Sequence, residues 1–150
     1  MKIKLAIPDE NMEEIRQFFE EKGFTIDEDA DYILTRRQRY VGHLSVRNPG
    51  NGDKAFVDVN DILYIESFGH QMDIVTLEGT WNATDPLYQL LEVLDPDKFT
   101  RISKSVIIAK HKVKEIRPSF SMKYVLIMQD GKHLEVTRSY YNRFRDAFNI

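Results

Sequence analysis

The chain has 150 residues, a formal net charge of −3 and 42% hydrophobic residues, a composition typical of a folded globular protein and not of a disordered one. It contains no cysteine, which excludes disulfides, thiol nucleophiles and thiolate metal sites. No apolar run is long enough to span a membrane, and acids and Pro8 interrupt the N-terminus too early for a signal peptide. We therefore expect a cytoplasmic protein with one main core.

The overall charge conceals a division along the chain. Residues 51–97 carry one basic residue, Lys54, against ten acids, a net charge of −9. Residues 98–150 carry twelve Lys or Arg against four acids, a net charge of +8. So basic a segment suits a face that binds a large anion such as a nucleic acid. Charge alone leaves open the alternative that the basic segment pairs with its acidic neighbour inside one fold.

Residues 1–40 predict a small strand-helix-strand unit. Residues 2–7 alternate basic with apolar side chains, and a helix with apolar residues at helical spacing then runs to Gly23, a typical C-terminal stop. Extended structure is predicted again between residues 24 and 34. The unit is too small to hold a core alone, so it must pack on the rest of the chain or on a second copy. It is our candidate for dimerisation or for docking an inhibitor.

Residues 41–150 predict a mainly β domain with minor α content. Apolar or alternating runs predict strands near residues 44–46, 56–65, 72–77, 102–108, 113–116, 124–128 and 134–136. One clear helix is predicted after Asp85-Pro86, where leucines share a face until Asp95-Pro96. Asp130-Gly131 predicts a hairpin turn, and the tail from Arg138 has helix-compatible spacing. Trp81 and Phe99 are interpreted as core residues.

Three of these strands end in polar or basic residues. Short hydrogen-bond donors mixed with Arg and Lys suit phosphate oxygens, and long side chains can reach base edges in a DNA groove. The candidate DNA-binding residues are Gly69, His70 and Gln71; Arg101, Ser103, Lys104 and Ser105; and Thr137, Arg138 and Ser139.

Several blocks of the chain, in this order, resemble the LytTR DNA-binding domain of bacterial transcription regulators. They are DILYIES, a strand ending in EGT, LYQLLEVL, DPDKFTRISKSVIIA and DGKHLEVTRSY. The resemblance covers about residues 41–150 and implies stacked antiparallel β-sheets whose loops enter successive major grooves. The family's three DNA-contacting places fall on the three candidate groups, where His70, Lys104 and Arg138 would read base edges. The resemblance thus implies a stand-alone regulator that binds double-stranded DNA, with a homodimer and a membrane-bound regulatory partner as candidates.

The chain departs from the family pattern at two places. The second contact block commonly carries a His-Arg or His-Asn pair, and here the pair is Ser103-Lys104. Lysine lacks the guanidinium fork, so the recognised sequence should differ. Many members also carry a phosphoacceptor receiver domain, which needs about a hundred residues. Asp27, Asp29 and Asp31 are therefore not interpreted as a phosphorylation pocket, because forty residues cannot form a doubly wound sheet.

Two rival functions are kept in view. The histidines at 43, 70, 111 and 133 show no nucleophile elbow, zinc spacing or Gly-rich phosphate loop, so we expect no enzyme activity, cofactor, metal or small-molecule substrate. The other rival is an interaction module whose basic face binds RNA or an acidic protein. Several further cations can bind phosphate or serve only as surface charges: Arg36, Arg37, Arg39, Lys110, Lys112, Lys114, Lys123, Arg143 and Arg145.

Overall fold

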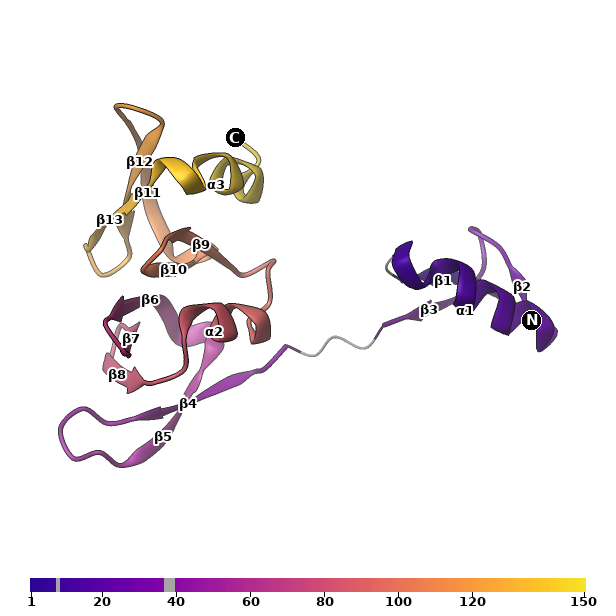
Figure 1. The fold of residues 1–150 in the computed structure, drawn as a ribbon, viewed down its shortest axis with the longest axis horizontal. Helices are drawn as coiled ribbons and strands as arrows, with labels where there is room; N and C mark the ends of the chain where they lie inside the picture. Colours follow the sequence, from indigo (N-terminus) through magenta and orange to yellow (C-terminus); the bar gives the residue numbers. More distant parts are fainter. Residues whose placement is uncertain (8, 37–39) are drawn as a thin grey trace. The chain divides into compact units, whose positions relative to one another are not determined.

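The computed structural model describes residues 1–7, 9–36 and 40–150, and the chain divides into two compact units, Met1–Arg39 and Tyr40–Ile150 (Figure 1). Arg37 and Arg39, two of the further cations named above, lie outside the described residues.

The first unit is a three-stranded parallel sheet with one helix. Its elements are β1 (Lys2–Ala6), α1 (Asp9–Glu21), β2 (Thr25–Ile26) and β3 (Tyr32–Thr35), and the strand order is β2-β1-β3. Ile3 and Leu5 of the central strand are buried. Asp9 and Glu10 lie in the first turn of α1, where the helix dipole favours negative charge.

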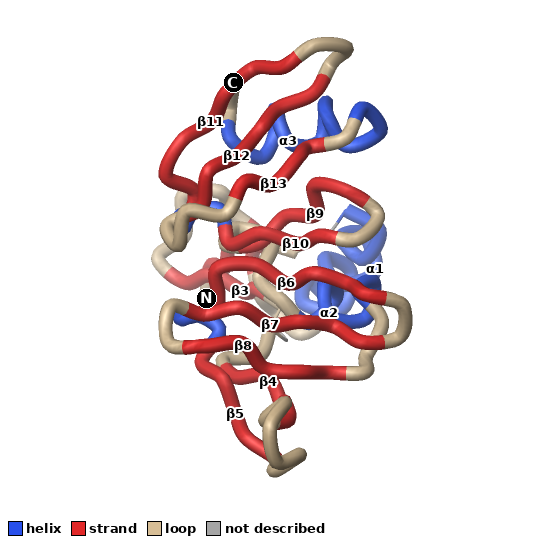
Figure 2. Tube along the Cα trace, turned by 90° about the vertical axis from the view of Figure 1, so that its left-hand side faces the viewer, coloured by secondary structure: helices blue, strands red, loops and turns tan. Residues whose placement is uncertain are grey.

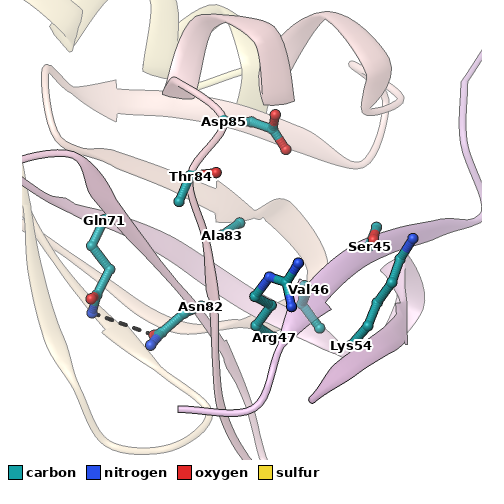
Figure 3. Close-up of a pocket in the computed structure, with 9 residues that line it drawn as sticks. All are labelled: Ser45, Val46, Arg47, Lys54, Gln71, Asn82, Ala83, Thr84 and Asp85. Atoms are coloured by element: carbon teal, nitrogen blue, oxygen red, sulfur yellow. Dashed lines mark hydrogen bonds between the residues drawn. The ribbon is translucent and has the colours of Figure 1, made fainter. Parts of the chain in front are cut away.

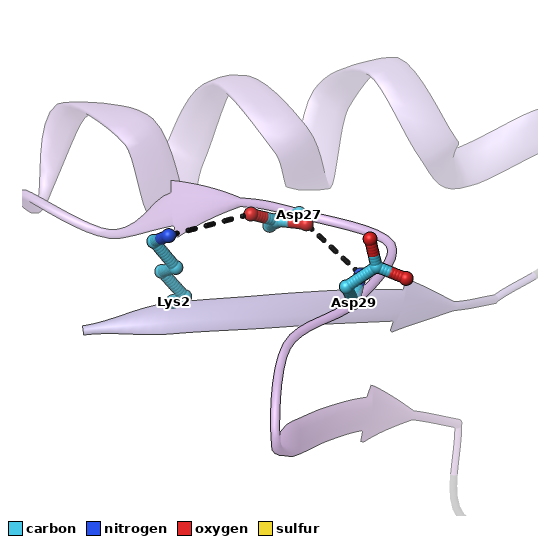
Figure 4. Close-up of polar contacts among 3 residues, drawn as sticks. All are labelled: Lys2, Asp27 and Asp29. Atoms are coloured by element: carbon cyan, nitrogen blue, oxygen red, sulfur yellow. Dashed lines mark hydrogen bonds and ion pairs between the residues drawn. The ribbon is translucent and has the colours of Figure 1, made fainter.

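The predicted strand-helix-strand unit is present, and the extended structure predicted between residues 24 and 34 consists of two strands, β2 and β3. The carboxylate of Asp27 accepts the backbone N–H of Asp29 at 2.9 Å and pairs with Lys2 Nζ at 3.6 Å (Figure 4). This Asx-turn ends β2 and lets the chain pass to the opposite edge of β1. Asp27 and Asp29 therefore have a structural role in the turn.

The second unit contains a seven-stranded and a three-stranded antiparallel sheet (Figure 2). The larger sheet has the order β5-β4-β8-β7-β6-β10-β9, and the smaller has the order β11-β12-β13. The strands of the larger sheet are β4 (His43–Arg47), β5 (Lys54–Asp58), β6 (Ile62–Phe68), β7 (Gln71–Thr76), β8 (Gly79–Ala83), β9 (Phe99–Ser103) and β10 (Val106–Ala109). The strands of the smaller sheet are β11 (Val113–Ser119), β12 (Lys123–Met128) and β13 (His133–Val136).

Two α-helices accompany these sheets, the predicted clear helix and a second one in the tail, where the spacing was compatible with a helix. The helix α2 (Leu87–Val93) follows Asp85-Pro86 as predicted, and α3 (Tyr141–Phe148) forms the tail. Short 3-10 turns at Val59–Asp61, Lys110–Lys112 and Arg138–Tyr140 connect neighbouring elements. Lys110 and Lys112 thus lie in a turn, and only Lys114 is on a strand.

Two hydrophobic cores lie on opposite faces of the central strands. The α2 core contains Ile62 and Ile65 of β6 together with Leu87 and Leu90 of α2. The α3 core contains Leu63 and Tyr64 of β6, residues of the smaller sheet, and Phe144 of α3. The β6–β7 pairing shifts register between Ile62 and Tyr64, which breaks the usual alternation and lets two successive residues enter one core. Strand β6 is therefore covered on both faces.

Both predicted core aromatics belong to the α2 core. Phe99 is buried within it, and Trp81 packs against it with partial exposure. As the single tryptophan, Trp81 is a natural fluorescence reporter for unfolding of the second unit.

We predict that Phe144→Ala destabilises the second unit by about 3–5 kcal/mol, because Phe144 is fully buried and its removal leaves a cavity in the α3 core. The change should be measured by urea unfolding followed through Trp81 fluorescence. Trp81 reports from the other core, so a shifted midpoint would show that the two cores unfold together. The control Tyr88→Ala removes an exposed aromatic of α2 and should leave the midpoint nearly unchanged. An unmoved midpoint in Phe144→Ala would contradict the prediction.

Candidate functional site

Three turns of the second unit lie next to one another. They are the β6–β7 turn, the β9–β10 turn and the segment that follows β13. The backbone N–H of Ser67 donates to the carbonyl of Ser105 at 2.8 Å, and that of Thr137 donates to the carbonyl of Ile102 at 3.0 Å. These bonds join the β9–β10 hairpin to both neighbours. Figure 2 shows the two turns and the end of β13 along the same side of the domain, on the right of the view.

An open hollow of about 560 Å³ lies between the second and third turns. It is lined by five of the predicted site residues: Ser103, Lys104, Ser105, Thr137 and Ser139. The hydroxyls of Ser103 and Ser105 are 3.4 Å apart, and the Ser105 N–H donates to Ser103 Oγ at 3.2 Å. Hydroxyl donors beside an exposed lysine are a chemistry suited to phosphate oxygens.

The hollow also contains residues that the sequence reasoning did not assign to the site. Lys132 and His133 line it, together with the acids Glu66 and Glu135. Glu135 pairs with Lys123 at 3.3 Å, which engages one of the weaker cationic candidates. Glu66 belongs to the acidic segment, residues 51–97, and also lines this hollow. The acidic segment is therefore not wholly separate from the candidate site. Pairing of β12 with β13 brings Lys132, His133 and Glu135 beside the site. Residue spacing in the sequence gave no signal for this pairing.

Arg101 bonds to the β9–β10 turn itself. Its Nε donates to the carbonyl of Ser103 at 3.0 Å, and a terminal nitrogen donates to the carbonyl of Lys104. Its guanidinium carbon lies 5.9 Å from the ring centroid of Tyr140. Arg101 was predicted to contact DNA, and in this structure its donors hold the turn that presents Lys104. We therefore treat Arg101 as a positioning residue.

The first predicted group is divided between two places. Gly69 has a φ of +65°, which glycine tolerates best, and His70 is exposed beside it at the tip of the turn. Gln71 begins β7, and its amide donates to Asp73 Oδ1 at 3.0 Å. The same amide donates to Asn82 Oδ1 at 3.4 Å (Figure 3). It lines a separate hollow of about 290 Å³ with Arg47 and others. Gln71 is thus held along the sheet, away from the hollow that contains Lys104.

Arg138 lies at the start of the Arg138–Tyr140 turn and is exposed. Its Nε donates to the carbonyl of Ser121 in the β11–β12 turn at 3.3 Å. This single bond leaves the terminal nitrogens of the guanidinium with no partner among the hydrogen bonds of the described residues.

Several other cations are engaged by aromatic rings. Arg143 lies 5.1 Å from the Tyr140 ring centroid, so Tyr140 faces two guanidinium groups. Arg145 lies 5.7 Å from the Tyr141 ring, and Lys110 lies 6.0 Å from the Phe148 ring. Tyr140 was not predicted as part of the site, although an aromatic between Arg138 and Arg143 was a visible signal.

A buried tyrosine connects the two sheets close to the site. The Tyr64 hydroxyl donates to Asp130 Oδ2 in the β12–β13 turn at 2.8 Å. Burial raises the pKa of Tyr64 far above its ordinary value, and the hydrogen bond to Asp130 raises it further. The phenol therefore remains a donor and holds the smaller sheet, which carries the third turn, against β6.

Comparisons with known proteins identify the family and the fold of the second unit. The family model of the LytTr DNA-binding domain matches residues 53–149. The chain belongs to the LytTR family. The family resemblance predicted from the sequence is confirmed, and so is the mainly β fold of antiparallel sheets.

Relatives include regulators from two bacteria. The sensory transduction protein LytT of Bacillus subtilis is 25% identical over 120 residues, which are 80% of this chain and 50% of that protein. The transcriptional regulatory protein LytR of Staphylococcus aureus is 29% identical over 89 residues, 57% of this chain and 36% of that protein. The chain thus spans about half the length of LytT and about a third of the length of LytR.

A solved LytTr DNA-binding domain from Bacillus cereus has the same fold. Its TM-score to this chain is 0.69 at 22% identity, over 73% of this chain and 99% of that one. The matched family model is that of a DNA-binding domain, so family membership gives this LytTR chain a DNA-binding function. Within the described residues, no helix is both long and apolar enough to cross a membrane.

We predict that Arg101→Ala loosens the β9–β10 turn of this LytTR domain. Loss of two charge-assisted hydrogen bonds should make amide exchange at residues 103–106 about tenfold faster, with little change elsewhere. Hydrogen exchange followed by mass spectrometry measures this. Arg117→Ala, which removes an exposed arginine paired with Glu115 on β11, serves as the control. Unchanged exchange in Arg101→Ala would mean that the turn does not depend on Arg101.

Proposed function

We propose that this LytTR chain regulates transcription by binding specific duplex DNA sequences through its three neighbouring turns, with the outer turns in successive major grooves. The β9–β10 turn is the middle one, joined by backbone hydrogen bonds to the β6–β7 hairpin and to the segment after β13. Fixed spacing between the turns is what a protein needs to match the repeat of a double helix. This joined row of turns is the observation that carries the proposal.

The middle turn has the chemistry of a phosphate contact. Ser105 offers an exposed hydroxyl 3.4 Å from that of the buried Ser103, and Lys104 adds an exposed charge that Arg101 presents through the turn backbone. Contacts to phosphates fix the register of a protein on DNA without reading sequence. The family resemblance implied that Lys104 reads base edges, but its place beside Ser105 leads us to infer that it lies against the phosphate backbone between the two grooves.

The outer turns carry the side chains that can read bases. Exposed His70 extends from a turn with Gly69 at its bend, and Arg138 keeps terminal guanidinium nitrogens for a ligand. Arginine pairs in bidentate fashion with guanine, which makes Arg138 the main source of specificity in this proposal.

The proposal extends to assembly through the first unit. Parallel sheets are ordinarily covered on both faces, and this unit has one helix for its three parallel strands. Edge strand β3 exposes Tyr32 and Ile33, 63% and 62% accessible. We infer that a second copy of the chain binds this strand, as suits a protein that reads paired half-sites. A membrane-bound regulatory partner is the other candidate.

We predict that Ile33→Asp converts a dimer of the full chain into a monomer, because a charge on this edge opposes strand pairing. Sedimentation over a range of concentrations measures the change. Phe56→Asp, which makes the same change in charge at an exposed apolar residue on edge strand β5 of the other unit, should keep the dimer. A wild-type chain that stays monomeric throughout would exclude the second copy and favour another partner.

We predict that Arg138→Ala weakens specific binding by about 1–3 kcal/mol and relaxes selectivity at the bases it reads. The duplex should be selected from a random pool at physiological salt, and affinity measured by fluorescence anisotropy. Lys104→Ala is the matched comparison, expected to weaken specific and non-specific duplexes alike and to reduce the salt slope by about one.

Two results would contradict this function. Undiminished affinity in Arg138→Ala would remove the third contact. Equal binding of the wild-type chain to RNA and to all duplexes would favour the rival interaction module.

A further inference from the structure

We propose that the β11–β12 turn is a fourth DNA-contacting element, in which Phe120 wedges against base steps that flank the sequence read by the other three turns. This inference rests on the proposed function and adds a residue to it.

Phe120 is far more exposed than a side chain of its type usually is. It is 90% accessible, and Met122 beside it is 50% accessible. Single exposed apolar residues are common on protein surfaces, but two in one three-residue turn form a small apolar tip. The turn lies between the paired residues Ser119 and Lys123. No packing within the second unit explains a phenylalanine there.

The backbone of this turn is held in an unfavourable conformation. Ser121 has a φ of 60° and Met122 a φ of 58°, and neither residue is glycine. Left-handed conformations cost free energy in side-chain-bearing residues and tend to cluster at binding sites. Glycine or asparagine would satisfy this bend with less strain. A Ser-Met pair therefore favours a binding role for the tip over a role as a simple connection.

The turn is bonded to the site already described. Arg138 Nε donates to the carbonyl of Ser121, so the tip and the third contact residue are linked directly. In Figure 2 the β11–β12 turn lies at the top of the domain, beyond the end of β13, and continues the row of turns on the right of the view. DNA that contacts Arg138 would therefore pass the tip of this turn.

The chemistry around Phe120 suits a DNA wedge. Proteins that bend DNA insert apolar side chains between base steps from the minor groove, while nearby cations hold the flanking phosphates. Arg138 and Lys123 supply positive charge on either side of the turn, although Lys123 also pairs with Glu135. The hydrogen bond between Ser121 and Arg138 favours DNA over a protein as the partner of this turn, because Arg138 is the residue that we propose reads bases.

The test compares two duplexes that contain the sequence selected by the full chain. The long duplex extends about one helical turn, roughly 10 base pairs, beyond the protected sequence on each side, and the short duplex is trimmed to that sequence. The wild-type chain should bind the long duplex about fivefold more tightly than the short one. Phe120→Ala should abolish this difference and leave affinity for the short duplex unchanged.

A control variant and two further measurements accompany this comparison. Phe56→Ala removes another exposed phenylalanine, on edge strand β5 of the larger sheet, and should retain the preference for the long duplex. Energy transfer between dyes at the ends of the long duplex should report a bend with the wild-type chain and a smaller bend with Phe120→Ala. Trp81 fluorescence verifies that each variant is folded.

The outcomes separate this inference from the proposed function. Equal affinity of wild type and Phe120→Ala for the long duplex overturns the wedge and leaves the three turns intact. An equal loss of affinity for both duplexes would also overturn the wedge, because it would make Phe120 part of the turn scaffold. A Phe120→Ala variant that lost self-association but kept its DNA affinity would overturn it as well. If the wild-type chain bound no duplex at all, the proposed function would fail first.

Discussion

The arrangement of this domain depends on β6 and β10, a strand pair with a hydrophobic core on each face. Residues of both strands enter the α2 core and the α3 core, so neither strand can shift without disturbing both. The β6–β7 and β9–β10 turns leave the same end of this pair, where Glu66 lies opposite Val106. Tyr64 extends the same constraint to the smaller sheet through Asp130. The paired strands β6 and β10 thus set the spacing between the turns that carry the candidate DNA-binding side chains.

Charge has a narrower role than the sequence suggests. The basic segment holds twelve cations, but several are engaged within the domain: Arg101 with the turn carbonyls, Lys123 with Glu135, and Arg117 with Glu115. Two lysines remain at the hollow, Lys104 beside the serine hydroxyls and Lys132, and Arg138 lies nearby. Such a surface combines general attraction to phosphate with a small number of directional donors. It fits a protein that distinguishes one duplex from another.

Much of the fold was predictable because local signals agreed with tertiary structure. Asp85-Pro86 and the leucine spacing predicted α2, and Asp130-Gly131 predicted the β12–β13 turn. The turn that divides the second extended segment into β2 and β3 was not predicted, because the Asx-turn at Asp27 depends on a side-chain bond that strand patterns do not show. The register shift in β6 also has no signal in alternation.

The sequence proposed three segments for the candidate site but did not predict their geometry. Family blocks identified His70, Lys104 and Arg138, whereas the bonds that hold Gln71 along the sheet and turn Arg101 inward come from cross-strand neighbours. Residues such as Lys132 and Tyr140 join the site only through strand pairing and packing. A Phe between two serines, at residues 119–121, was a visible anomaly whose meaning required the turn and its bond to Arg138.

The most direct test of the account is to map the amide chemical-shift changes of the Tyr40–Ile150 unit, within the full chain, on titration with its selected duplex. We expect the largest changes at residues 69–70, 103–105 and 137–139, in one continuous band across the three turns. Changes concentrated instead at the acidic β7–β8 turn and on β5, with the three turns unaffected, would contradict it.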